Sequence, residues 1–452
     1  MRHYRAIIPL LAILLIGCQS DEYTDNPTSL DKDLTLLLNE RSQDQGLSFF
    51  ILPNETDYAS IPQDPLNPIT SEKVRLGRLL VHETATGGNP KMPGNKHMYA
   101  CASCHPAASG FSAGIRQGIG EGGIGFGFAG EGRVPMNEGS MPRDSIDVQP
   151  IKPPTLINVA YQEVALWNGA LGAQGINAPY VQQNADVVPE NLFGFQGLET
   201  QGIAGQKAHR LKIDAEFAEE FGYKSYFDAA FPSSPVEERY GAINGALAIA
   251  AFNRTILANQ APWQEWLRGS TDALTEDQKK GAMVFFDKGK CFECHTGPAL
   301  KSNEFHAWGL QDFNPEETII FAGTRKSFNI ETQRGRGEIT GRAEDDYKFK
   351  VPTLYNLKMN KFYGHGGSLT SIRDVVEYKN NGVKQNVGVP DEQLATQFGA
   401  LNLTEEEVTN LVDFLVNGLY DPNIERYAPD SVLSGNCIPN NDPQSRIDLG
   451  CD

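Results

Sequence analysis

The sequence predicts a chain of α-helices joined by long loops and large enough for two or three domains. Its 452 residues include 45 glycines and 27 prolines, which indicate extensive loop structure. Apolar residues recur with helical spacing between these loops, notably over 71–81 and 237–258. The formal charge of -18 disfavours nucleic acid as a partner and would attract a small basic protein.

The first 17 residues have the pattern of a secretion signal. Arg2 and Arg5 precede an apolar run over 7–16 that is too short to span a membrane. The run ends in Leu-Ile-Gly-Cys, as at a lipoprotein cleavage site, so Cys18 is expected to carry lipid. An ordinary cleaved signal is the alternative. The expected location is the periplasmic side of a bacterial membrane or the cell surface, with a lipid anchor.

A five-residue unit, Cys-x-x-Cys-His, occurs at 101–105 and again at 291–295. Two thiols at this spacing can form thioethers with the two vinyl groups of one porphyrin, and the adjacent histidine can coordinate its iron. A zinc half-site or a redox dithiol explains one copy, but not two copies that each end in histidine. The pattern predicts two covalent haem c groups, bound by Cys101, Cys104, His105, Cys291, Cys294 and His295.

Cys437 and Cys451 remain, and in an exported chain they predict a structural disulfide that closes a tail over 431–452. Residues 18–62 are polar and predict a tether that contains one helix over 30–40. The Pro-Ser-Ser-Pro run at 232–235 predicts a domain boundary. The expected units are therefore a signal peptide, this tether, two haem domains at 63–234 and 235–430, and the tail.

Two local patterns add detail to these domains. Residues 110–139 are rich in glycine and predict a long loop laid against a haem face or a ligand channel. Thr70 or Ser71 is expected to cap the helix over 71–81, and Thr275 with Gln278 fits a capping box at the start of another helix.

Longer segments on both sides of the boundary resemble the bacterial dihaem cytochrome c peroxidases, a family that includes MauG, an oxidase of a protein substrate. The resemblance covers about 71–417. The segments that carry it include LGRLLVHETATGG (76–88), PPTLINVAYQEVALWNG (153–169), GLETQGIAGQKAHRL (197–211), FKVPTLYNLKMNKFYGHGGSL (349–369) and IRDVVEYKNNG (372–382).

This resemblance implies a mostly α fold of two cytochrome c-like haem domains with long Gly-rich loops. It implies that the N-terminal haem reduces hydrogen peroxide to water and that the C-terminal haem relays electrons from a small cytochrome or cupredoxin. Peroxide reduction needs two electrons and each haem supplies one, which agrees with two haems. A MauG-like oxidase of a protein or organic substrate, and a non-catalytic electron-transfer cytochrome, are the alternatives. A homodimer is expected by analogy.

Three candidate catalytic residues follow from the resemblance. Trp167 matches a tryptophan between the haems, against the alternative of a core tryptophan. Glu199 matches a glutamate that moves a proton between the peroxide oxygens, against the alternative of a surface helix cap. Glu121 stands where many members carry a histidine ligand. It is a poor ligand, so the N-terminal haem is expected to be high-spin and open, with Glu121 as a second pocket acid or a solvent-facing residue.

The sixth ligand of the C-terminal haem is also expected to depart from the family. His365 matches a histidine that is not normally the ligand, and the position of the usual Met or Tyr falls on Lys379, beside Tyr378. A lysine ligates only as the neutral amine. The order of candidates is Lys379, Tyr378 and then Met359, and a solvated Lys379 is the alternative.

Two expectations concern other charged groups. Lys152 replaces an asparagine that ligates calcium in family members, and an ammonium is the wrong charge for such a ligand. Bound calcium is therefore not favoured, and the charge of the lysine could take the place of the ion. The haem propionates are expected to meet arginines of a polar stretch, namely Arg325, Arg334, Arg336 and Arg342.

Overall fold

The computed structural model describes residues 27–149, 151–313 and 333–451. The expected signal peptide, Cys18 and Arg325 lie outside the described residues. The described chain is mostly helical, with two small antiparallel sheets. Among its helices, none is long and apolar enough to cross a membrane.

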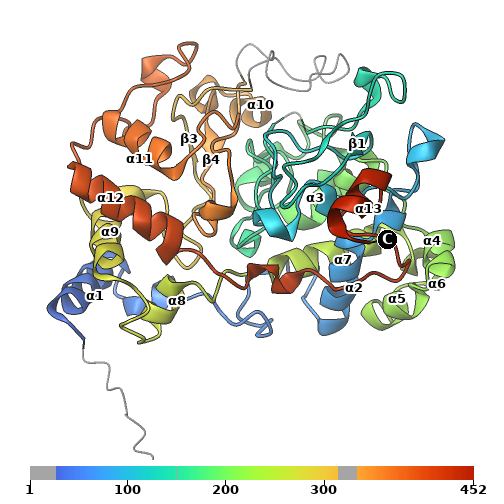
Figure 1. Cartoon of the computed structure of the whole chain (residues 1–452), viewed down its shortest axis with the longest axis horizontal. Helices are drawn as coiled ribbons and strands as arrows, with labels where there is room; N and C mark the ends of the chain where they lie inside the picture. The colour runs from blue at the N-terminus through green and yellow to red at the C-terminus, as the bar shows by residue number, and fades with distance from the viewer. Residues whose placement is uncertain (1–26, 150, 314–332, 452) are drawn as a thin grey trace, which may run out of the picture.

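The helices gather in two halves that lie side by side (Figure 1). The half drawn on the right contains α2 (Ser71–His82), α3 (Gly197–Ala208), α4 (Ala215–Glu220), α5 (Lys224–Ala230), α6 (Val236–Arg239) and α7 (Ala242–Arg254). The half drawn on the left contains α1 (Ser29–Arg41), α8 (Pro262–Leu267), α9 (Glu276–Phe286), α10 (Gly337–Thr340), α11 (Ile372–Asn381) and α12 (Glu405–Asp413).

Each half is built on a pair of helices that cross at a glycine. In the N-terminal half, α2 packs on α7, and a Cβ at Gly77 would lie 2.0 Å from the carbonyl oxygen of Ala248. In the C-terminal half, α9 packs on α12, and a Cβ at Gly281 would lie 2.0 Å from the carbonyl oxygen of Asn410. Only glycine permits such a close approach of two backbones. The two halves therefore repeat one packing arrangement, in which the first helix of the pair precedes a Cys-x-x-Cys-His unit and the second follows it.

The expected boundary at 234/235 does not follow this packing. The helix expected over 237–258 is two helices, α6 and α7, because Gly241 interrupts it and serves as the N-cap of α7. Since α7 packs on α2 and α3, it belongs structurally with the N-terminal half. We propose that the N-terminal unit extends to the end of α7, at Arg254.

The tether expected over 18–62 is also wrong for its described part. Its single helix is present as α1, but Leu34 and Leu38 are fully buried and α1 packs on α9. Asp31 of α1 forms a buried ion pair with Lys279 at 2.8 Å and accepts a hydrogen bond from Trp266 Nε1. These contacts make α1 part of the C-terminal half, because an unattached tether would bury neither the leucines nor the charge.

The predicted helix caps are confirmed. Thr70 caps α2 by accepting a hydrogen bond from the backbone N–H of Lys73. At the start of α9, Thr275 and Gln278 form the reciprocal capping box, with distances of 3.2 and 3.1 Å. Each cap satisfies N–H groups that have no partner within the helix.

The C-terminal tail crosses from α12 to the N-terminal half, where α13 (Pro443–Leu449) lies beside β1 (Gly123–Ile124) (Figure 1). The predicted disulfide between Cys437 and Cys451 is present. β1 pairs with β2 (Val134–Pro135), and these strands are the regular structure within the Gly-rich stretch. Asp442 of the tail forms a buried ion pair with Arg133 at 3.2 Å. The tail therefore fixes the Gly-rich stretch from outside.

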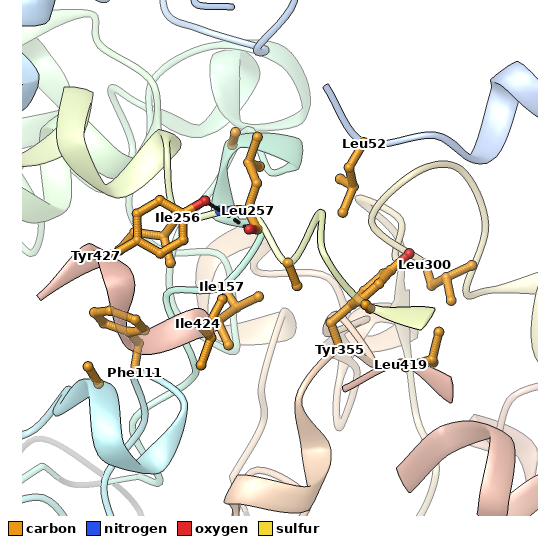
Figure 2. Close-up of a cluster of buried hydrophobic side chains, with 14 of the residues drawn as sticks. Leu52, Phe111, Ile157, Ile256, Leu257, Leu300, Tyr355, Leu419, Ile424 and Tyr427 are labelled. Atoms are coloured by element: carbon orange, nitrogen blue, oxygen red, sulfur yellow. Dashed lines mark hydrogen bonds between the residues drawn. The ribbon is translucent and has the colours of Figure 1, made fainter. Parts of the chain in front are cut away.

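A core of apolar side chains joins the two halves (Figure 2). Phe111 and Ile157 of the N-terminal half lie on one side of it, with Tyr355 and Leu300 of the C-terminal half on the other. Tyr427 reaches back from the chain that follows α12 and donates a hydrogen bond to the carbonyl of Leu257 at 2.9 Å. This shared core holds the two motif-bearing segments in a fixed relation.

Candidate haem sites

The first motif forms a short 3₁₀ turn at Cys101–Ser103 that ends at His105. The imidazole Nδ1 of His105 lies 3.0 Å from the backbone carbonyl of Phe111. A carbonyl can only accept, so Nδ1 donates the proton and Nε2 keeps its lone pair. Burial lowers the pKa of His105 to about 4, which keeps the ring neutral. Both properties suit a histidine that ligates iron.

The second motif repeats this arrangement. Cys291–Glu293 form the 3₁₀ turn, and Nδ1 of His295 lies 3.1 Å from the carbonyls of both Leu300 and Pro352. Burial lowers the pKa of His295 to about 4 as well. The two histidines, far apart in sequence, thus have the same tautomer and the same free nitrogen.

A large cavity opens on the second motif. Cys291, Cys294 and His295 line one part of it. Its walls are mainly apolar and come from α9, α11, α12 and the segment after β4 (Phe349–Lys350), with Phe285, Val351, Leu354, Ile372, Val376 and Leu411 among them. A hydrophobic slot with two thiols and an imidazole at one edge fits a covalent haem. The donor set and the walls therefore agree with the cofactor that the motif predicts.

β4 pairs with β3 (Phe305–His306) and carries Lys350 to the wall of this cavity. Cys294 Sγ, Glu304 and His306 lie close enough together to hold a metal ion. That grouping would use a thiol that haem attachment consumes, so it is not an independent metal site.

The structure separates the three candidates for the sixth ligand of the C-terminal haem. Lys379 and Tyr378 both line the cavity, whereas Met359 packs against Gly110 and is absent from the cavity wall. The hydroxyl of Tyr378 donates to the carbonyl of Trp308 at 2.6 Å, and burial raises the pKa of Tyr378 to about 12. Both effects disfavour the phenolate that ligation requires.

Lys379 has a different environment. Its Nζ lies 3.9 Å from the centre of the Trp308 ring and, within the described ranges, has neither a hydrogen bond nor an ion pair. Burial lowers the pKa of Lys379, although nearby thiols of the motif oppose this shift. The amine of Lys379 is therefore one of the side-chain nitrogens on this wall that have no hydrogen bond or ion pair within the described ranges.

Trp167 lies on the wall of the same cavity. Its Nε1 donates to the carbonyl of Lys152 at 2.8 Å, and its own backbone carbonyl accepts from the N–H of Lys350 at 2.8 Å. The indole meets His365 edge to face at 6.4 Å, and His365 pairs with Asp312 at 2.7 Å. The ring of Trp167 therefore has two of these contacts, and the backbone of Trp167 has the third.

Glu121 is fully buried, and its carboxylate receives four donors. These are the backbone N–H groups of Lys91 and Met92, each at 2.9 Å, the amide of Asn95 and the guanidinium of Arg210. A carboxylate has about four acceptor positions. Glu121 therefore has none left for a substrate, and the expectation that it is solvent-facing is wrong.

Glu199 lies in the first turn of α3 and is fully buried beside Arg254 of α7. The guanidinium donates from Nε at 3.1 Å and from Nη2 at 2.8 Å, and the amide of Asn67 donates at 3.2 Å. The alternative of a surface helix cap is excluded by this burial. With three donors, the carboxylate of Glu199 keeps one acceptor position, unlike that of Glu121.

Several charged groups near the motifs were not predicted from the sequence. His209 forms an ion pair with Asp147 at 2.9 Å, and its charge helps to lower the pKa of His105, so this pair lies near the first motif. Lys301 and Lys350 line the cavity of the second motif together with Lys152. No local pattern marks these residues, because their partners are distant in sequence.

The arginines expected at the propionates lie elsewhere. Arg334 pairs with Asp346 and Arg342 with Glu344, while Arg336 donates to backbone carbonyls of Asn168, Gly169 and Ile176. Within the described chain, none of these three arginines lines the cavity. Propionate binding by these arginines stays a prediction.

Comparison with known proteins agrees with the motifs. Residues 71–272 match a family model described as di-haem cytochrome c peroxidase. The chain is 26% identical over 363 residues to the methylamine utilization protein MauG of Methylorubrum extorquens, covering 79% of this chain and 80% of the relative. It is 27% identical to cytochrome c peroxidase Ccp of Escherichia coli, covering 79% of this chain and 61% of that relative.

Solved structures show the same fold. A MauG-like protein associated with microbial copper homeostasis matches with a TM-score of 0.56 and 22% identity, over 83% of this chain and 96% of that one. The diheme peroxidase BthA from Burkholderia thailandensis matches with a TM-score of 0.51 and 15% identity, over 80% and 89%. The chain is thus similar to dihaem cytochrome c peroxidases and MauG proteins.

Proposed function

We propose that this protein binds two haem c groups through its two motifs and reduces hydrogen peroxide to water at the N-terminal haem. Electrons would enter at the C-terminal haem from a small cytochrome or cupredoxin. The observation that carries the proposal is the repeated histidine geometry, with Nδ1 of His105 and of His295 bound to backbone carbonyls and Nε2 free. Each haem supplies one-electron chemistry at its iron when bound.

The two sites differ in what the chain offers on the opposite side of each iron. At the C-terminal site, Lys379 lines the cavity with a free amine and is the proposed sixth ligand, ahead of Tyr378. At the N-terminal site, Glu121 has replaced the expected histidine and is fully occupied by its own donors. Lys379 would thus help to hold the C-terminal haem, which would relay electrons, whereas Glu121 would not bind the N-terminal haem, which would supply the peroxide chemistry.

Glu199 is the proposed acid–base residue. The guanidinium of Arg254 lies beside its carboxylate at 2.8 Å, and one acceptor position remains. An ionised carboxylate can accept a proton from one peroxide oxygen and return it to the other. Glu121 does not take part in this proposal as a proton carrier, because its acceptor positions are filled. Its proposed role is to hold the loop of Lys91 and Met92 in place.

Trp167 is proposed to lie on the route of the electrons. The Nε1 of its ring donates to the carbonyl of Lys152. Lys152 comes directly before the segment that contacts the region of the first motif. Trp167 itself lines the cavity of the second motif. An aromatic ring fixed between two redox centres shortens the through-space gap that an electron must cross. We also propose that the protein lies outside the cytoplasm, with lipid attached to Cys18, and that it forms a homodimer.

The test is a steady-state assay of peroxide reduction with a reduced small cytochrome as donor. Glu199→Gln is expected to lower kcat/KM for peroxide by about 10² to 10⁴, the usual contribution of a general acid–base group. Glu121→Gln is the matched control, because it alters another buried glutamate paired with arginine. Both variants are compared at equal haem content. Wild-type kcat/KM in Glu199→Gln, with the haems intact, would reject the role of Glu199.

A MauG-like oxidase is the second candidate, favoured by the similarity to MauG over 79% of this chain. The same assay separates the two candidates. An absence of peroxide turnover, with a lasting spectral change after peroxide is added, indicates the oxidase. An absence of both indicates an electron-transfer cytochrome.

A further inference from the structure

Three lysines are buried in the cavity of the second motif. Lys152, Lys301 and Lys350 have exposed fractions of 5%, 7% and 6%, and all three line the cavity. Lysine is almost never buried to this extent unless it has an opposite charge beside it. The cluster therefore needs an explanation that the apolar walls do not give.

The contacts of the three amines are with neutral groups. Lys301 Nζ donates to Gln162 Oε1 at 3.0 Å, and Lys350 Nζ donates to the same oxygen and to the carbonyl of Val164 at 3.2 Å. Lys152 Nζ donates to the hydroxyl of Ser112 at 3.2 Å. In the part of the chain that the structure describes, none of the three forms an ion pair with a carboxylate.

Electrostatics points the same way. Burial alone lowers the pKa of Lys152 to about 8 and that of Lys350 to about 7. Burial also lowers the pKa of Lys301, and the charge of Lys350 lowers it further. Among the residues that the structure describes, no carboxylate opposes these shifts. Isolated buried charges are strongly unfavourable, so the cavity is suited to a ligand that brings negative charge.

The cluster lies on the side of the cavity that carries Trp167. The backbone N–H of Lys350 donates to the carbonyl of Trp167 at 2.8 Å, and Lys301 and Lys350 share the side chain of Gln162. The cysteines of a motif bond to the vinyl groups of the porphyrin, so its two propionates remain for other groups of the chain to bind.

Lys152 extends the cluster toward the first motif. Its neighbour Pro153 accepts a hydrogen bond from Ser112, and Ser112 follows Phe111, the residue whose carbonyl orients His105. A cation at this position can act on both haem sites.

We propose that Lys301 and Lys350, held together by Gln162, bind the propionates of the C-terminal haem, and that Lys152 supplies the positive charge between the two haems. The inference rests on the haem binding proposed above, but not on the peroxidase activity. In this proposal, the lysines of the chain balance the negative charge of the propionates, and no divalent cation is needed.

The test measures the midpoint potential of each haem by spectroelectrochemical titration of the holoprotein. Removing a cation favours the more positive ferric form, so Lys350→Met is expected to lower the potential of the C-terminal haem. A tenfold change in the ferric/ferrous equilibrium, or about 59 mV for one electron, is expected. Lys350→Arg retains the positive charge, so the potential of its C-terminal haem should stay close to that of the wild type. Lys152→Met is expected to lower both potentials.

Lys358→Met is the matched control, since Lys358 is an exposed lysine of the same half that does not line the cavity. Haem content and circular dichroism establish that each variant is folded and loaded. Unchanged potentials in folded, loaded Lys350→Met and Lys301→Met would overturn the proposal. A shift of the wild-type potentials on adding calcium or a chelator would overturn it too, because a divalent ion would then supply the charge. If the lysine variants show the expected shifts in haem potential but the wild-type protein does not reduce peroxide, only the proposed peroxidase activity would be rejected.

Discussion

The buried glutamates of the N-terminal half and the buried lysines of the cavity form a contrast. Glu121 and Glu199 each have an arginine from the same chain beside them. The lysines of the cavity, by comparison, meet amide, hydroxyl and carbonyl oxygens. A buried charge that is balanced within the chain holds elements together. A buried charge without such a partner indicates that the folded chain is completed by a ligand.

The largest effect is expected from unbalancing one of the complete pairs. Arg254→Met leaves the carboxylate of Glu199 buried and unpaired, both side chains being 0% exposed. The free energy of unfolding is expected to fall by about 3–5 kcal/mol. Denaturation with guanidinium chloride measures it. The double variant Arg254→Met/Glu199→Gln should recover much of the loss, and a double variant as unstable as Arg254→Met would contradict the account.

A smaller effect is expected from releasing the tail that carries Asp442, the partner of Arg133. Replacing Cys437 and Cys451 by serine opens a link between residues 14 apart, which is expected to lower the free energy of unfolding by about 3 kcal/mol. Hydrogen exchange should increase in 123–135, which the tail contacts. Unchanged exchange in this stretch would show that the tail does not fix it.

The smallest effect on stability, but a clear spectral one, is expected at the isolated amine of Lys379. Lys379→Met keeps the side-chain volume, so the free energy of unfolding should change by less than about 1.5 kcal/mol. If Lys379 ligates the C-terminal haem, a near-infrared thioether band should replace the band of the amine complex. Tyr378→Phe is the control and should lose the hydrogen bonds of its hydroxyl with the carbonyl of Trp308 and the N–H of Gln385, about 1 kcal/mol each. A near-infrared spectrum of Lys379→Met identical to that of the wild type would exclude Lys379 as the ligand.

Much of the local structure could be predicted because its causes are local. Thr275 and Gln278 cap α9 through groups three residues apart, and the Cys-x-x-Cys-His spacing suits one porphyrin whatever surrounds it. The disulfide of Cys437 and Cys451 followed from the count of cysteines once the motifs had claimed four.

The sequence by itself thus determined the helices, the attachment motifs and the family resemblance. The tertiary structure decided which charges are balanced: Arg254 reaches Glu199 because α7 packs on α3, and Lys152 meets the wall of Lys301 and Lys350 because the shared core joins the two halves. It also decided that α1 is core and that α7 belongs with the N-terminal half. The physical reason is that the energy of a buried charge depends on partners that are far apart in the chain and close only after folding.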